Sequence, residues 1–212
     1  MKRVVPVLVG VLFALGAMAG TYAQAPQGAP PVQGQGQGRG DAGQGRQGGG
    51  RGGGRGAAPA CTNLACDVQA DWARSMRLLT TTAEAMPEDK WSYKSTPAQR
   101  TFGEQVMHIV QIDQKLLAGL GGKTPAPQIN LKATSKAEVL AALRQSLDYG
   151  AAVIKEFDDQ GLLERVPGMF LGASASRVRL INFSMSHSQD VYGQMVVYLR
   201  LNGIVPPASN PA

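Results

Sequence analysis

Residues 101–122 decide the fold; they read TFGEQVMHIVQIDQKLLAGLGG. Thr101 and Glu104 form a capping-box pattern, in which each side chain satisfies a free backbone N–H of the other residue at a helix start. Apolar residues then recur every three or four positions, at Phe102, Val106, Ile109, Val110, Leu116, Leu117 and Leu120. Gly121 and Gly122 supply a left-handed stop. The stretch therefore predicts one amphipathic helix with a defined beginning and end.

Two further segments show the same periodicity on either side of this stretch. The first runs from Asn63 to just before Pro87, with apolar residues at Leu64, Val68, Trp72, Met76 and Leu79. A second capping-box pattern at Ser135 and Glu138 opens another helix, which carries the apolar stripe to Phe157 and closes at Gly161. These patterns predict helices before and after the central one.

A fourth helix is predicted from about Ser176 to Gly203, because the following IVPP cannot continue a helix. Its apolar stripe consists of Leu180, Ile181, Val191, Tyr198 and Leu199. No strand pattern competes with the four segments. Four helices of roughly 20 residues and no strands predict an all-α four-helix bundle.

The chain divides into three parts by composition. Residues 1–25 carry Lys2, Arg3 and an apolar run, and end in a small-x-small pattern at Ala23 and Ala25, so they are interpreted as a signal peptide cleaved before Pro26. Residues 26–60 are rich in Gly, Gln, Pro and Arg, which is typical of a disordered linker. Residues 61–212 form the predicted folded domain. The alternative to cleavage is a retained membrane anchor, for which the apolar run is short.

The positive charge lies mostly in the two N-terminal parts. The chain carries +6; the signal contributes +2 and the linker +3, so the folded domain carries +1. Nucleic-acid binding is therefore not expected of the domain. The Arg-Gly repeats of the linker resemble RNA-binding segments, but an exported chain meets little RNA. We expect a periplasmic or secreted protein with no stable membrane anchor after signal cleavage.

Cys61 and Cys66 stand at the entrance to the folded domain. An exported chain meets an oxidising compartment, where a short-loop disulfide can form. Two cysteines with no histidine nearby make a poor zinc site, and their spacing differs from that of a thioredoxin-type redox pair. The sequence leaves open whether the two cysteines are bonded.

The two histidines are the main candidates for chemistry. His108 lies in the second predicted helix and His187 in the fourth, each on or beside an apolar stripe. Facing helices could bring the two imidazoles together. Each residue could equally be a hydrogen-bonded core histidine. Two histidines on separate helices, with no others in the chain, favour a polar site in the core.

Two carboxylates lie one helical turn from the histidines. Glu104 precedes His108 by four residues, so it could be a ligand, an orienting group or a general base; otherwise its capping box occupies it. Asp190 follows His187 by three residues and could complete a site of two histidines and one carboxylate for iron or zinc, or lie on the helix surface. The sequence names no catalytic residue, and no serine-nucleophile or nucleotide-binding motif appears.

Two stretches resemble the DinB family of damage-inducible-type proteins. They are AMPEDKWSYKSTPAQRTFGEQVMHIV and HSQDVYGQMVVYLRLNGIVPPAS, and the resemblance spans roughly residues 63–209. It implies an up-down-down-up order of the four helices, with the connections at residues 87–100 and 160–176 crossing the bundle. It also allows a homodimer. The larger superfamily contains thiol-dependent S-transferases and maleylpyruvate isomerase.

The resemblance also implies a divalent metal, held by three histidines on the second and fourth helices. His108 and His187 match two of these positions, and the third is Val191, which cannot donate an electron pair. Asp190 or Glu104 would have to replace the missing ligand, for zinc, nickel or iron. Two functions follow as expectations: a metal-dependent hydrolase or thiol S-transferase acting on an unidentified small molecule, or a non-catalytic binding protein that has lost the metal.

Overall fold

The computed structural model describes residues 60–210, and the expected signal peptide and the linker up to residue 59 lie outside this range. Within it the protein is mostly helical, with little strand. The long helices are α1 (Leu64–Ala85), α2 (Phe102–Ala118), α3 (Lys136–Ile154) and α5 (Arg177–Leu201), and α4 (Asp159–Leu163) is short. No helix of the described part is long and apolar enough to cross a membrane.

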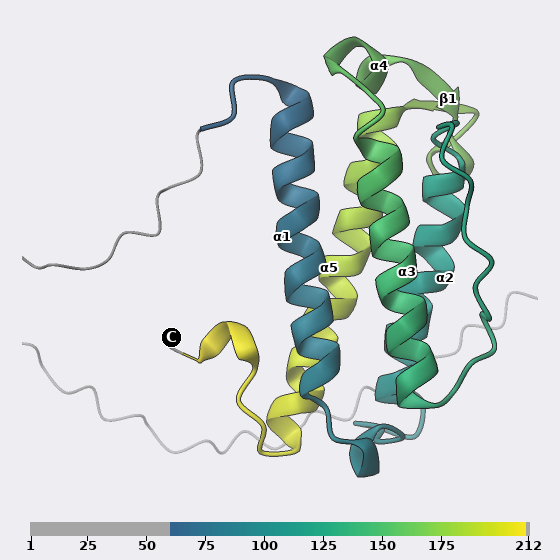
Figure 1. The fold of residues 1–212 in the computed structure, drawn as a ribbon. Coiled ribbons are helices and arrows are strands. Elements are labelled where there is room, and N and C mark those ends of the chain that lie inside the picture. Colours follow the sequence, from purple (N-terminus) through teal and green to yellow (C-terminus); the bar gives the residue numbers. More distant parts are fainter. Residues whose placement is uncertain (1–59, 211–212) are drawn as a thin grey trace, which may run out of the picture. The chain divides into compact units, whose positions relative to one another are not determined.

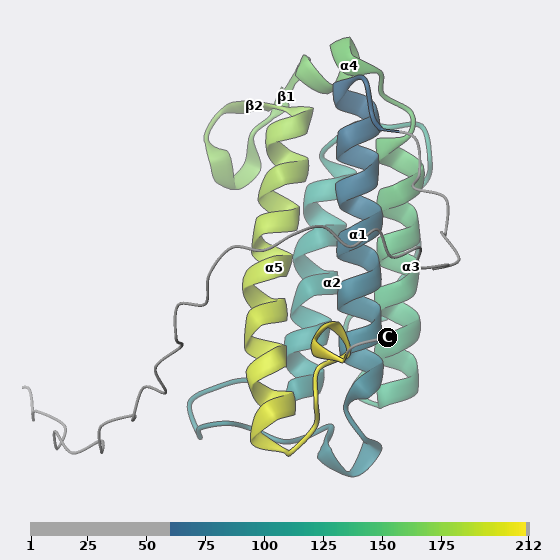
Figure 2. The ribbon, with the colours of Figure 1, turned by 90° about the vertical axis from the view of Figure 1, so that its left-hand side faces the viewer.

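The four long helices pack side by side around one core. α1 contacts α3 and α5, and α2 contacts the same two helices. Figures 1 and 2 show that α2 and α3 run in one direction while α1 and α5 run in the other. α2 and α3 are neighbours that point the same way, so the chain between them must return along their length. Residues 119–135 make that return (Figure 1). The up-down-down-up order that the resemblance implied requires such a return, although the sequence analysis named only the other two long connections.

The two connections expected to cross the bundle lie at its ends. Residues 86–101 join α1 to α2 at one end, and residues 155–176 join α3 to α5 at the other (Figure 1). Neither pair of joined helices is among the main packing contacts, all of which fall between α1 or α2 and α3 or α5. Each connection therefore spans the end of the helix group between diagonally placed helices.

The core needs close approach at one glycine. Trp72 of α1 is buried, and its indole Nε1 donates to the Leu147 carbonyl oxygen of α3 over 3.1 Å. A Cβ at Gly150 would lie 2.1 Å from the Trp72 ring, a separation that real atoms cannot adopt. Gly150 thus allows α3 to approach the tryptophan, although it lowers the helix propensity of its own turn.

The two predicted capping boxes are found at the starts of α2 and α3, one in full and one in part. The Thr101–Glu104 capping box is present in full at α2. At α3 the Ser135 hydroxyl oxygen accepts from the Glu138 N–H, but the Glu138 carboxylate accepts from the Ser135 hydroxyl and not from its backbone N–H. The second box is therefore incomplete, because its return bond goes to the side chain.

The third helix ends earlier than predicted, and strands follow it. α3 stops at Ile154, and the Asp158 carboxylate then caps α4 by accepting from the Gly161 N–H. A two-stranded antiparallel hairpin of β1 (Arg165–Pro167) and β2 (Ser174–Ser176) follows α4. The expectation of no strands was wrong here, because three-residue strands are too short to show an alternating pattern. Three 3₁₀ turns complete the fold, at Glu88–Lys90, Met169–Leu171 and Pro207–Ser209.

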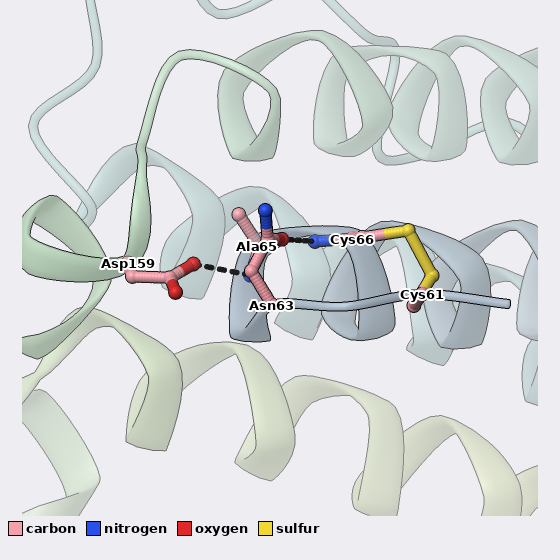
Figure 3. Close-up of a disulfide and its surroundings, with 5 residues drawn as sticks. All are labelled: Cys61, Asn63, Ala65, Cys66 and Asp159. Carbon is pink, nitrogen blue, oxygen red and sulfur yellow. Dashed lines mark hydrogen bonds between the residues drawn. A yellow bond between two sulfur atoms is a disulfide. The ribbon is translucent and has the colours of Figure 1, made fainter.

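A disulfide joins Cys61 to Cys66 at the start of α1 (Figure 3). Beside it, the Asn63 side chain caps the helix by accepting from the Cys66 N–H over 2.8 Å. The Ala65 N–H donates to Asp159 of α4, also over 2.8 Å. The first turn of α1 is therefore held by the disulfide, a cap and a contact from α4.

Candidate functional site: a histidine pair between two helices

α2 and α5 bring the two histidines together. Both side chains are half-buried, and their Nε2 atoms lie 3.1 Å apart. The ring centroids of His108 and His187 are 4.8 Å apart, and the rings meet edge to face at 72°. This distance is that of a hydrogen bond, so one imidazole Nε2–H donates to the unprotonated Nε2 of the other.

Both histidines are held in the neutral form. Burial is the largest cause that lowers the pKa of His108, followed by the positive charges of Arg100 and His187. Burial also lowers the pKa of His187, and the nearby carboxylate of Asp190 opposes the effect only in part. Arg100 lowers this pKa too. A pair of neutral imidazoles at neutral pH is what the hydrogen bond between them requires.

The second nitrogen of His187 identifies the tautomer. His187 Nδ1 is buried and has no hydrogen-bond partner among the described residues. An unpaired N–H buried away from water is costlier and rarer than an unpaired acceptor. The favoured tautomer of His187 therefore carries its proton on Nε2 and donates to Nε2 of His108.

The third family position contributes no ligand. Val191 is 2% exposed and packs in the apolar core. Asp190 is exposed, and its carboxylate accepts from the Gln194 amide over 3.0 Å. Gln194 in turn accepts from the amide of the buried Gln105 over 2.8 Å. Asp190 is thus part of a glutamine-linked network between α5 and α2.

Glu104 is engaged in the helix cap. Its carboxylate accepts from the Thr101 N–H over 2.6 Å, and the Thr101 hydroxyl oxygen accepts from the Glu104 N–H over 3.1 Å. The backbone bond to Thr101 is the first of the causes that lower the pKa of Glu104. The carboxylate is ionised and occupied at the start of α2.

The donor set does not fit the metal centre that the resemblance implies. In the part of the chain that the structure describes, no three His, Cys, Asp or Glu side chains gather closely enough to hold one ion. A metal on Nε2 of His187 would also move the proton to its buried Nδ1, which has no acceptor there. Metal-binding histidines almost always donate this second N–H to a partner. Both a third ligand and the supporting hydrogen bond are missing.

A second polar cluster lies in the same helix interface, and the sequence analysis did not single it out. Asp113 of α2 is 1% exposed. Its carboxylate accepts from the Ser184 hydroxyl of α5 over 2.5 Å and from the Ser188 hydroxyl over 3.3 Å. We call these three residues the Asp113 cluster. It provides a buried carboxyl group one and a half helical turns from His108.

Burial sets the protonation of Asp113. Loss of water raises the pKa of this carboxyl to about 7, even though the hydrogen bonds from Ser184 and Ser188 act in the opposite direction. The position could have been read from the sequence, because Asp113 continues the spacing from Phe102 through Ile109 that predicts the buried face of α2. A carboxylate on a predicted core stripe is the signal that was missed.

The fold and the site together describe a class of protein. The described chain is a mostly helical protein in which two facing helices hold a histidine pair and a buried carboxyl group. The chain belongs to the DinB superfamily, whose family model matches residues 69–195. The comparison with curated proteins gives no match.

Two solved structures have a similar fold. A DinB-like protein from Bacillus cereus ATCC 10987 matches with a TM-score of 0.59 and 19% identity, over 66% of this chain and 93% of the other. A DinB-like protein from Bacillus subtilis matches with a TM-score of 0.53 and 16% identity, over 65% and 92% of the two chains. At these identities the likeness concerns the fold alone.

Proposed function

We propose that this DinB-superfamily chain is an exported four-helix-bundle protein that binds a small molecule without a metal. The observation that carries the proposal is the environment of His187. The third ligand position holds the buried Val191, and His187 Nδ1 has no acceptor among the described residues. A histidine pair in this state can donate and accept hydrogen bonds, but it lacks a family-type ligand set. The binding function is the one that this arrangement supports best.

The disulfide supports the export part of the proposal. Cys61 and Cys66 are bonded, and structural disulfides persist mainly in secreted and periplasmic proteins. The signal-peptide pattern at residues 1–25 points the same way. The mass of the exported protein tests this: a chain that begins at Pro26 is expected, and a chain that retains Met1 would contradict export by cleavage.

The second candidate is a metal-dependent hydrolase or thiol S-transferase. One observation favours it: the Nε2 atoms of His108 and His187 converge at 3.1 Å, close to the spacing of two nitrogens on one tetrahedral ion. Water or a substrate thiol would then have to supply the missing ligands. The two candidates differ in one measurable property, the metal affinity of the natural chain.

Metal content distinguishes the two candidates. The natural protein and its Val191→His variant should be purified identically and examined by elemental analysis and by calorimetric titration with zinc and nickel. We expect the natural chain to be metal-free and to bind weakly, and the variant to bind more tightly, because positions 187 and 191 are one turn apart on a helix.

The controls separate a histidine site from adventitious binding. His187→Ala in the Val191→His background should remove the gained affinity. Tight stoichiometric binding by the natural chain that His187→Ala abolishes would overturn the metal-free proposal. Failure of Val191→His to bind any of the metals would show that the three positions do not converge on an ion, which would leave the pair as core histidines.

A further inference from the structure

A cavity of about 660 Å³ lies against the N-terminal half of α2. Its walls come from the continuous stretch of residues 91–111, which includes the first turns of α2, and from residues 131–134. Its volume lies in the range of sites that hold drug-sized molecules. The cavity is therefore large enough for an organic ligand of moderate size.

The charged side chains that line this cavity are mostly positive. Lys94, Arg100 and Lys132 line it, and Glu104 is its one acidic lining residue. None of the three cations forms an ion pair with a residue between 60 and 210; the two ion pairs found there involve Arg144 and Arg177. Lys94 and Arg100 lie near enough to Glu104 to lower the pKa of its carboxyl. That carboxylate is already bonded to Thr101, so the cavity retains an excess of positive charge.

The α2 N-terminus adds no free donors to this charge. The N–H groups of its first residues are all bonded: Phe102 to the Tyr93 carbonyl, Gly103 to the Trp91 carbonyl, and Glu104 to the Thr101 hydroxyl. Anion binding here would therefore rest on the lysine and arginine side chains. Arg100 is the best suited of them, because a guanidinium can hold a carboxylate through two parallel hydrogen bonds.

The rest of the wall is mixed, with polar side chains such as Gln99 and Gln111 beside apolar ones. Trp91, Met107 and Leu131 line the cavity, and Leu131 is 37% exposed although it is a large apolar residue. The indole Nε1 of Trp91 is buried without a partner among the described residues. It lies against Gly103, where a Cβ would be 2.3 Å away. Trp91 and Met107 are largely buried, so they offer an apolar edge next to Leu131. Such an edge beside unpaired cations suits a ligand with one apolar part and one anionic group.

Neither histidine lines the cavity, but His108 lies on α2 close to the residues that do. Glu104, Met107 and Gln111 line the cavity, and His108 lies between them on α2, four residues after Glu104 and three before Gln111. The charge of Arg100 reaches both histidines, since it lowers the pKa of each. Arg100 therefore links the cavity to the histidine pair through its charge.

We infer that this cavity binds a small organic acid, with its carboxylate held by Arg100 and Lys94 and its apolar body against Trp91, Met107 and Leu131. The inference rests on the proposed binding function and names its ligand class. It does not depend on the metal result, because none of these residues belongs to the expected ligand set. The two proposals can therefore fail separately.

The probe is 1-naphthoate, with the uncharged 1-naphthamide as its matched partner, titrated by calorimetry into the mature chain. Naphthoate should bind in saturable fashion and the amide about tenfold more weakly, because the amide loses the charge-assisted hydrogen bonds. Increasing salt should weaken naphthoate binding and leave amide binding nearly unchanged. Equal affinity for acid and amide, or no naphthoate binding at millimolar concentration, would overturn the inference.

Variants locate the binding. Lys94→Gln combined with Arg100→Gln should weaken naphthoate binding about tenfold or more. The control Lys115→Gln removes a charge from an exposed position of α2 outside the cavity and should have little effect. Ala98→Phe keeps every cation but fills part of the cavity, and it should also reduce binding. Circular dichroism melts show whether each variant is folded. Binding that survives both the double variant and Ala98→Phe would place the acid elsewhere and refute the assignment.

Discussion

The histidine pair and the Asp113 cluster occupy the same interface between α2 and α5, but they differ in burial and in hydrogen bonding. The histidines are half-buried, bond to each other and leave His187 Nδ1 without a partner. Asp113 is 1% exposed and accepts from two serines. The more buried group is thus the better satisfied one. Full hydrogen bonding is what is expected of a buried structural polar group, whereas a buried group without a partner needs a separate explanation.

The two sites should also respond to pH in opposite directions. Burial disfavours the charged form of each group, and the charged form of a carboxyl is the deprotonated one, while that of a histidine is the protonated one. Burial therefore raises the pKa of Asp113 and lowers those of His108 and His187. Rising pH should destabilise the protein through the first site, and falling pH should destabilise it through the second.

The largest expected effect is that of Asp113→Asn. The folded protein keeps a proton on this carboxyl up to about pH 7, while its ordinary pKa is 3.8, so the free energy of unfolding should fall as the pH rises from about 4 to 7. The amide cannot ionise. The variant should therefore be more stable than the natural chain at pH 8, by up to about 4 kcal/mol, and similar at pH 4.

Urea unfolding at several pH values measures this difference. Asp148→Asn is the matched control, because Asp148 is exposed on α3. Parallel pH profiles for the natural chain and Asp113→Asn would show that the carboxyl is solvated, and the contrast between the two sites would then disappear.

The next effect concerns the metal-free state of Val191→His. The substitution buries an imidazole in place of an apolar side chain that is 2% exposed, so with EDTA present it should destabilise the protein by about 2 kcal/mol. Zinc should recover part of this loss if the three histidines converge, because a ligand that binds only the folded state stabilises it. Thermal melts with and without zinc measure the loss of stability and its recovery. Val191→Leu should not respond to zinc, and an equal response of both variants would point to binding elsewhere.

A smaller effect is expected at the α2 cap. Thr101→Ala removes the hydroxyl that accepts from the Glu104 N–H and should cost about 1 kcal/mol, measured as a shift of the urea midpoint. The exposed Thr96 provides the control substitution Thr96→Ala. If Thr101→Ala left stability unchanged but altered zinc binding, Glu104 would be a ligand and not a capping residue.

The smallest expected effect is the titration of the histidines themselves. Both pKa values should lie below the ordinary 6.5. The folded state then binds fewer protons than the unfolded chain just below this pH, so the free energy of unfolding should decrease as the solution is acidified. NMR titration of the imidazole resonances, assigned with His108→Gln and His187→Gln, measures the direction. A pKa above 6.5 for either residue would contradict burial as the dominant cause.

Much of the fold could be predicted from local patterns. The spacing of apolar residues and the Thr101–Glu104 box located α2, and Asn63 marked the start of α1. Local patterns do not specify which helices are neighbours, so the return of residues 119–135 followed only from the up-down-down-up order that the resemblance implied. The hairpin was missed because its strands are only three residues each.

The site was predictable to a different extent. His108 and His187 stood out because they are the only histidines in the sequence. Asp113, Ser184 and Ser188 are common residue types, and only their place on the two helix stripes distinguishes them. The cavity forms where residues 131–134 pack near residues 91–111, and no local pattern indicates that approach.

The late position of α5 in the chain has a consequence for synthesis. α1, α2 and α3 leave the ribosome first, but α5 contacts both α1 and α2 and supplies the serines that satisfy Asp113. Until residues 177–201 emerge, the α2 surface that carries Asp113 and His108 has no partner helix. An incomplete chain of this kind exposes apolar surface and is prone to aggregation. If the chain is exported as proposed, the same unfinished surface would be exposed before translocation.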